Sequence, residues 1–282
     1  MTITVRKLTP TLGAELNGVD ISNLDEATFQ EIRQLWIEHE LLLFRGLELT
    51  EAELVEFSRR FGALEIHVRA EYLSEEHPEI LLVSNMKKAD GTPLGILSER
   101  DVGWHHDQIY LPRPAVGSFL HGAKVPPSGG CTYFADLAGA YDALPVRLKT
   151  AIEGLKAVHS YEYFNGQYSV PTNKTQKERT PEVEHPLVRT HPYSGRKALY
   201  VDQGMTPRIA GLAEDESRAL LQELFEFSVR PEFVYRHDWR PGDGLLWDNA
   251  STMHRRDPFD PQHERLMKRT TILSPGELAV PF

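Results

Sequence analysis

The sequence predicts a mainly β domain, a barrel or jelly roll, with a few helices packed on its outside. Many short runs rich in β-branched and aromatic residues are bounded by Gly, Pro and Asn, as strands are. Amphipathic helical stretches are few and lie between these runs. No fixed-period repeat occurs along the 282 residues, which argues against a solenoid or a propeller. We therefore expect a single domain over residues 1–282.

The N-terminal third is predicted to alternate short strands with two amphipathic helices. Asn23 and Glu26 have the spacing of a capping box, so a helix is expected to begin there. The apolar run at residues 41–44 ends at a turn and indicates a buried strand. Thr50 and Glu53 form a second capping box. The apolar stripes at helical spacing are Phe29, Ile32 and Trp36, and then Leu54, Phe57 and Phe61.

From Pro78 onward the sequence becomes β-rich. Short strands are expected at residues 80–83, 116–120 and 233–239. Residues 186–201 are predicted to form a hairpin that turns at 192–195. Two helices interrupt the strands, and their apolar positions are Leu148, Ile152 and Leu155 in the first, and Leu220, Leu221, Leu224 and Phe225 in the second.

Two polar stretches fit no regular element. Residues 86–103 lead directly into the most informative motif of the chain, so we predict a lid there. Residues 165–184 are rich in Gln, Asn, Thr, Lys and Glu, and a lid and a disordered insertion are equally compatible with them.

Composition limits the classes of function. The chain has 31 basic and 41 acidic side chains, a net charge of −10, which argues against nucleic-acid and anionic-membrane partners. Its single cysteine, Cys131, excludes an intramolecular disulfide and a cysteine-rich metal site. No signal-like segment and no apolar run of about 18 residues occurs, so a cytoplasmic protein is expected. Twelve histidines and the carboxylates remain as metal ligands.

The tetrapeptide at residues 104–107 carries a possible metal site. On a strand, side chains two residues apart share a face, so His105 and Asp107 can converge while His106 points away. One imidazole and one carboxylate are two thirds of the facial triad of non-haem Fe(II) oxygenases. Among twelve histidines such a pair also arises by chance, so structural packing remains the alternative for this tripeptide alone.

The third ligand has to be a distant histidine that the fold brings back. His254 closes a strand-and-turn segment at residues 246–254, and Arg265 lies eleven residues later, before a β-rich run at 270–273. A dicarboxylate co-substrate that chelates iron at one end needs a cation for its far carboxylate, and a guanidinium supplies bidentate, charge-assisted hydrogen bonds. These four residues together are much harder to meet by chance than the tripeptide.

The sequence resembles the Fe(II)/2-oxoglutarate-dependent dioxygenases of the taurine dioxygenase and chlorophenoxyacetate dioxygenase family. The resemblance spans nearly the whole chain, through LLLFRG, FSRRFG and the segments at 12–22, 125–136, 186–201, 247–254 and 265–273. It implies a double-stranded β-helix, a jelly roll, and a homodimer or homotetramer. It also implies that His105, Asp107 and His254 are the catalytic iron ligands, and that Thr132 and Arg265 hold the distal carboxylate of 2-oxoglutarate.

The chemistry that these residues permit is coherent in itself. Neutral histidine and ionised aspartate are the ligand types that such an iron takes. With O2, oxidative decarboxylation of 2-oxoglutarate gives succinate, CO2 and an oxidant that abstracts hydrogen from a nearby C–H bond. Related halogenases lack the carboxylate ligand. Within the resemblance, the presence of Asp107 therefore favours hydroxylation over halogenation.

The resemblance also predicts a small anionic organic substrate. Taurine dioxygenases grip a sulfonate through a histidine and an arginine that match His67 and Arg269. The tyrosine and the asparagine of the taurine pattern are replaced by Ala70 and Asp101, which argues against taurine. Asp101 stays among the predicted substrate contacts, and Tyr161 falls near the family's aromatic pocket wall, where core packing is the alternative.

Other residues have open or structural interpretations. Arg69 and Arg100 could bind a carboxylate or be solvated surface arginines. Cys131 is expected to be a small buried hydrophobe rather than a reactive thiol. Trp104 and Trp247 are expected to shield the iron from water. The remaining histidines of interest are expected to be structural or surface residues: His106, His121, His159, His185, His191 and His263.

Three rival functions remain. A non-catalytic jelly roll could bind a small ligand, but it need not keep all three metal ligands together with Thr132 and Arg265. A zinc hydrolase could use the same triad, but no separate general base is evident. Within the enzyme class, the chain could be a natural-product tailoring oxygenase.

Overall fold

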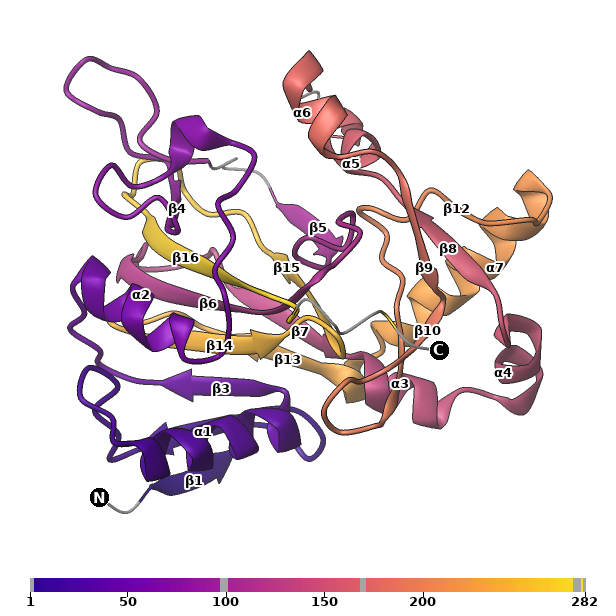
Figure 1. Ribbon diagram of the computed structural model, residues 1–282, viewed down its shortest axis with the longest axis horizontal. Coiled ribbons are helices and arrows are strands. Elements are labelled where there is room, and N and C mark those ends of the chain that lie inside the picture. Colours follow the sequence, from indigo (N-terminus) through magenta and orange to yellow (C-terminus); the bar gives the residue numbers. More distant parts are fainter. Residues whose placement is uncertain (1–2, 97–100, 168–170, 276–279, 281–282) are drawn as a thin grey trace.

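Two packed β-sheets form the centre of the molecule in the computed structural model, which describes residues 3–96, 101–167, 171–275 and 280 (Figure 1). In sheet order, the larger sheet contains β1 (Thr4–Lys7), β2 (Ala14–Asn17), β3 (Leu41–Phe44), β14 (Gly244–Asp248), β6 (Ala115–Lys124), β16 (Leu266–Leu273) and β4 (Leu81–Ser84). The smaller sheet contains β13 (Val234–His237), β7 (Thr132–Asp136), β15 (Thr252–Arg256) and β5 (Val102–His105). All pairs in the two sheets are antiparallel except β2 with β3.

The two sheets pack through an apolar layer between their inner faces. Phe134 on β7 contacts Trp247 on β14, with ring centroids 5.5 Å apart. Leucines and a methionine of the larger sheet complete the layer, among them Leu43, Leu120 and Met267. This arrangement of sheets confirms the predicted mainly β jelly roll with flanking helices.

Two N-terminal helices cover the outer face of the larger sheet. These are α1 (Glu26–His39) and α2 (Glu51–Arg59), and their apolar faces join one core with β3 and β6. The capping box of Thr50 and Glu53 is confirmed. The Asn23 cap is wrong, because Asp25 caps α1 by accepting a hydrogen bond from the Thr28 amide. Asn23 lies instead in the turn before the helix, where its backbone N–H donates to the Asp20 carbonyl.

A second group of elements lies on the opposite side of the molecule from α1 and α2 (Figure 1). A three-stranded sheet, in the order β12 (Arg208–Ile209), β8 (Lys156–His159) and β9 (Val183–Pro186), lies there with α7 (Glu214–Ser228) and α4 (Val146–Ile152). The predicted hairpin is confirmed as β10 (Val188–Thr190) and β11 (Lys197–Leu199). The remaining short elements are α3 (Leu137–Ala143), η1 (Ala70–Tyr72) and η2 (Pro231–Phe233).

The two polar stretches have more local structure than the sequence indicates. In the first, a β-bridge pairs Lys87 with Pro93, while residues 97–100 lie outside the described part of the chain. The second contains the end of α5 (Tyr161–Gln167) and all of α6 (Lys174–Arg179), whose cap is a reciprocal box of Asn173 and Gln176. That either stretch acts as a lid stays a prediction. Within the described residues, no helix has both the length and the apolarity needed to cross a membrane.

Gly117 on β6 lies where α1 packs closely against the larger sheet, so a larger residue there should destabilise the fold. A Cβ atom at Gly117 would lie 2.6 Å from the Trp36 indole and 2.9 Å from the Trp247 carbonyl oxygen, neither of which can move freely. We expect Gly117→Ala to lower the free energy of unfolding by about 1–3 kcal/mol through overpacking. Gly166→Ala is the control, because its Cβ would meet nothing within 4 Å. Urea unfolding measures both variants, and equal stability would contradict the predicted packing.

Candidate active site

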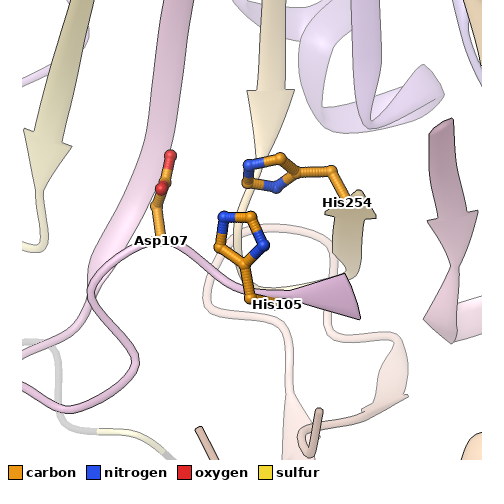
Figure 2. A group of neighbouring side chains, drawn as sticks. All are labelled: His105, Asp107 and His254. Atoms are coloured by element: carbon orange, nitrogen blue, oxygen red, sulfur yellow. The ribbon is translucent and has the colours of Figure 1, made fainter. Parts of the chain in front are cut away.

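Three potential metal ligands converge where β5 and β15 pair. His254 on β15 is the register partner of His105 at the end of β5. Asp107 reaches the same point from the turn after β5 (Figure 2). The two ligands converge as predicted, but the predicted shared strand face is wrong, because the strand ends at His105. One ligand atom from each residue lies within 4.8 Å of the others, and all three side chains are buried. The two imidazole centroids are 4.2 Å apart.

The protonation of these groups suits a divalent cation. Burial lowers the pKa of both His105 and His254, so both rings are neutral at neutral pH. The His105 Nδ1 atom is 2.8 Å from the Gly103 carbonyl and donates to it, which leaves the Nε2 lone pair available. Burial alone would raise the pKa of Asp107, but the Arg269 guanidinium and the hydrogen bond from Ser118 hold it below its usual range. Two neutral imidazoles and one carboxylate fit the ligand set of non-haem Fe(II).

A chain of hydrogen bonds orients the Asp107 carboxylate. Ser118 on β6 donates to its Oδ2 atom at 2.7 Å, and Arg269 on β16 donates to Oδ1. The Asn249 amide donates to Ser118 at 3.3 Å and accepts from the Trp247 indole at 3.0 Å. Outer contacts of this kind fix the direction of a ligating group. Neither Ser118 nor Asn249 was predicted, although a serine inside the apolar run of β6 was a usable signal.

His106 anchors the metal-binding segment from behind. Its side chain is fully buried and points away from the cluster, as predicted. Its backbone amide donates to Asp202 at 3.0 Å, and its Nδ1 atom lies 2.8 Å from the same carboxylate oxygen. This double contact fixes His106 to Asp202, and it therefore restrains the backbone between His105 and Asp107.

A cavity of about 380 Å³ opens beside the cluster. Among its described lining residues are four arginines and one carboxylate, that of Asp107. The arginines are Arg69, Arg256, Arg265 and Arg269. Apolar and aromatic groups supply much of the remaining wall, including Leu81, Val83, Leu120, Tyr161, Phe164 and Trp247. The cavity is therefore locally cationic, although the chain carries a net charge of −10.

Arg265 and Thr132 lie together in this wall and suit a carboxylate. Arg265 is 2% exposed, and its Nε and Nη1 atoms have no hydrogen-bond partner among the residues that the structure describes. Burial and the neighbouring Arg256 lower its pKa to about 9, so it remains a cation at neutral pH. The Thr132 hydroxyl accepts from the Trp239 indole at 2.9 Å, which leaves its own proton to donate. These observations fit the distal carboxylate of 2-oxoglutarate.

His67 and Arg269 lie in another part of the lining. Burial and the cationic field of Arg269 lower the pKa of His67 to about 3, so its ring is neutral. Its Nδ1 atom accepts from the Arg69 amide at 3.1 Å, so the ring proton is on Nε2. Arg269 donates to Asp107, whereas two nitrogens of Arg265 have no hydrogen-bond partner among the described residues. The two arginines therefore offer an acidic group different surroundings.

The remaining substrate predictions have different outcomes. Tyr161 is buried and lines the cavity. Its ring packs against that of Tyr110 at a tilt of 39°, and its hydroxyl accepts a hydrogen bond from Arg69 Nε at 3.1 Å. Arg69 is only 7% exposed, so its interpretation as a solvated surface arginine is wrong. Asp101 is exposed and is not among the described residues that line the cavity. Arg100 lies outside the described residues.

Other predicted roles can be compared with the structure. The Cys131 thiol is buried, and burial and Asp238 raise its pKa to about 11, which is unfavourable for a reactive thiolate. Trp247 is buried against His254 at 4.9 Å, as a water shield requires. Trp104 is half-buried against another apolar cluster and is not part of the described cavity lining. His263 is half-buried, and four other histidines are buried: His121, His159, His185 and His191.

The chain is similar to known proteins over nearly its whole length. Residues 4–271 match the family described as "Taurine catabolism dioxygenase TauD, TfdA family". An (S)-phenoxypropionate/alpha-ketoglutarate-dioxygenase of Sphingobium herbicidovorans is 35% identical, covering 95% of this chain and 94% of the relative. Pentalenolactone F synthase of Streptomyces avermitilis is 34% identical, covering 93% and 91%. A crystal structure of AAD-2 with Mn(II) and N-oxalylglycine has a TM-score of 0.84 and 31% identity, covering 99% and 100%.

The geometry predicts a metal site whose affinity depends on the hydrogen bond from Ser118 to Asp107. We expect His254→Ala and Asp107→Ala to abolish measurable Mn(II) binding in anaerobic calorimetry, because each removes one of three ligands. Ser118→Ala should weaken binding by about 10- to 100-fold, since it frees the Asp107 carboxylate to turn. His263→Ala is the matched control and should bind as the unmodified protein does. Undiminished binding by the His254 variant would remove it from the ligand set.

Proposed function

We propose a reaction and a site for this chain from one premise: it belongs to the taurine catabolism dioxygenase TauD, TfdA family. It is an Fe(II)- and 2-oxoglutarate-dependent dioxygenase, an oxidoreductase. It hydroxylates a C–H bond of a small anionic organic molecule and releases succinate and CO2. The observation that carries the site is the buried cluster of His105, Asp107 and His254 beside the unsatisfied guanidinium of Arg265.

The three clustered side chains hold the iron, and Arg265 with Thr132 holds 2-oxoglutarate. Bound Fe(II), with 2-oxoglutarate and O2, supplies the oxidant for hydrogen abstraction. Two imidazoles and one carboxylate would hold Fe(II) and would leave coordination positions for the co-substrate and O2. Arg265 provides charge-assisted hydrogen bonds to the distal carboxylate, and the Thr132 hydroxyl adds a donor. Trp247 and the surrounding apolar wall exclude water from the reacting groups.

Arg269 and His67 bind the acid group of the prime substrate in this proposal. Arg269 supplies the charge, and the neutral His67 ring supplies one N–H donor from Nε2. Tyr161 and Phe164 on α5 provide an aromatic wall for the apolar part of the molecule. An aryloxy carboxylate satisfies both requirements, and the phenoxypropionate dioxygenase relative supports that class.

A natural-product tailoring role is the second candidate, because pentalenolactone F synthase is almost as similar. The four cavity arginines favour an acidic substrate in either case. The non-catalytic binder is disfavoured by family membership and by a complete ligand cluster. Assembly into a homodimer or homotetramer and a cytoplasmic location stay predictions.

The reaction class has a spectroscopic test. Anaerobic addition of Fe(II) and 2-oxoglutarate should give a weak metal-to-ligand charge-transfer band in the visible, because 2-oxoglutarate would chelate the bound iron. Succinate release is then screened against aryloxyalkanoates, sulfonates, sulfate esters and other small carboxylates. Absence of the band in folded protein would defeat the oxygenase proposal, whereas a band without turnover would show only that the substrate is missing from the screen.

The two acid-binding places predict opposite kinetic effects. Arg265→Ala should raise the apparent KM for 2-oxoglutarate far more than the KM for the prime substrate, because it removes the cation for the distal carboxylate. Arg269→Ala should do the reverse. Both are assayed at saturating Fe(II), because Arg269 also holds the Asp107 carboxylate. Equal effects of the two variants on both KM values would contradict this division.

A further inference from the structure

We propose that the Tyr110 hydroxyl is a third donor to the acid group of the prime substrate, beside Arg269 and His67. This inference rests on the proposed function, which assigns that acid group to Arg269 and His67. Its basis is a cavity-lining phenol whose oxygen is buried and has no hydrogen-bond partner among the residues that the structure describes. None of the motifs identified in the sequence includes this residue.

Tyr110 is held in the turn that follows the proposed metal ligand Asp107. Gln108 has a φ of +61°, a left-handed conformation that side chains other than glycine rarely adopt, and its carbonyl accepts from the Leu111 amide at 3.0 Å. The Leu111 carbonyl in turn accepts from His185 Nε2 at 2.9 Å. These contacts turn the chain sharply after Asp107. Tyr110, three residues later, therefore lines the same cavity as that ligand.

The Tyr110 hydroxyl is a neutral donor in an apolar setting. The residue is 2% exposed and belongs to an apolar cluster with Val68, Tyr161 and Met205. Burial raises the pKa of its hydroxyl well above the ordinary value, so the proton stays on the oxygen at neutral pH. A buried hydroxyl without a partner has lost its hydrogen bonds to water, which costs free energy. An acceptor that a ligand brings would recover this loss.

Arg269 and His67 also have free donors in the same cavity. Arg269 Nη1 donates to Asp107, but its Nε atom is buried and unpartnered within the described part of the chain. His67 keeps its ring proton on Nε2, because its Nδ1 atom accepts from the Arg69 amide. Burial has the largest influence on the pKa of the Tyr110 hydroxyl and of the His67 ring, and the charge of Arg269 acts on both. The three donors therefore lie in the same part of the cavity lining.

The Glu65 carboxyl is the rival acceptor for this hydroxyl. After burial, its charge contributes most to the raised pKa of Tyr110. The Tyr110 oxygen and Glu65 Oε2 are nevertheless both buried without a partner among the described residues, so they are not bonded to each other. Burial raises the pKa of Glu65 to about 7, and its side chain is not among the described residues that line the cavity. The hydroxyl therefore remains available to a ligand that enters the cavity.

The donor set suits more than one kind of acid. A carboxylate has two oxygens and a sulfate ester has three terminal oxygens, and either group can accept three hydrogen bonds. The probes are therefore 2-phenoxypropionate and hexyl sulfate, and the one that binds the unmodified protein more tightly is carried through the variants.

The experiment compares Tyr110→Phe with the matched control Tyr200→Phe. Tyr110→Phe removes one oxygen and keeps the ring that packs 4.7 Å from the Tyr161 ring centroid. Tyr200 is fully buried in the same apolar cluster but is not part of the described cavity lining. Anaerobic calorimetry measures binding of Mn(II), then of 2-oxoglutarate to the Mn(II)-loaded protein, and then of the acid probe to the protein loaded with both. Thermal unfolding of the metal-free protein measures stability.

We expect Tyr110→Phe to weaken binding of the acid probe by about 10- to 100-fold, since a hydrogen bond to a charged acceptor is lost. Mn(II) and 2-oxoglutarate should bind as they do to the unmodified protein, because the hydroxyl contacts neither. The midpoint of thermal unfolding should not fall, because the variant removes a buried hydroxyl that has no partner in the described structure. Tyr200→Phe should bind all three ligands normally.

Several results would overturn the inference. One is binding of the probe by Tyr110→Phe at unmodified strength. Another is an equal loss for Mn(II), 2-oxoglutarate and the probe, which would indicate a distorted turn, or the same loss in Tyr200→Phe. If neither probe binds the unmodified, fully loaded protein, the inference fails while the proposed reaction keeps its own test in the charge-transfer band. If 2-oxoglutarate itself does not bind, the proposed function fails as well.

Discussion

The register of β15 is the constraint on which the rest of the site depends. Through its pairing with β5, this strand sets His254 opposite His105, and through its pairing with β7 it sets Arg256 opposite Thr132. A slip of one residue would turn every side chain of β15 to the other face of the sheet. The side chains of His254 and Arg256 would then leave the cavity wall together. One backbone alignment therefore positions both the side-chain cluster and part of the cavity wall beside it.

Burial of charge is the second physical feature of the site, and it is only partly compensated within the chain. The Asp107 carboxylate has Arg269 and Ser118 as partners, so its own charge is satisfied. Arg265 has no such partner among the described residues, and a buried guanidinium without one is expensive. The apolar layer between the sheets and the core beneath α1 and α2 must maintain this arrangement. A ligand that supplies the missing carboxylate would stabilise the folded protein by linkage.

The sequence was informative where chemistry depends on short spacing and uninformative where it depends on register. The His105-x-Asp107 pattern, the return of His254 and the cation at Arg265 were visible as motifs, and strand and helix types followed from periodicity and capping. Asn249 was missed because its role arises from a contact with Ser118, 131 positions away. Ser118 was missed although Asp107 is only 11 positions away, because the fold has to bring the turn after β5 against β6. The burial of Arg69 was missed for the same reason, since its hydrogen-bond partner Tyr161 is 92 positions distant. Asn23 was misassigned because two polar residues competed to cap one helix.

Charge placement also explains how one cavity can hold two acids without exchanging them. At one end of the cavity, a carboxylate would meet Arg265 and the Thr132 hydroxyl in a buried setting. Elsewhere in the cavity, an acid would meet Arg269, which shares its guanidinium with Asp107, and the single N–H donor of a neutral His67. Arg265 is buried with two nitrogens unsatisfied among the described residues, so a carboxylate there would be held in a setting of low dielectric. In the proposed function this end therefore suits the dianion that also chelates the metal, and the place beside Arg269 is left for the prime substrate.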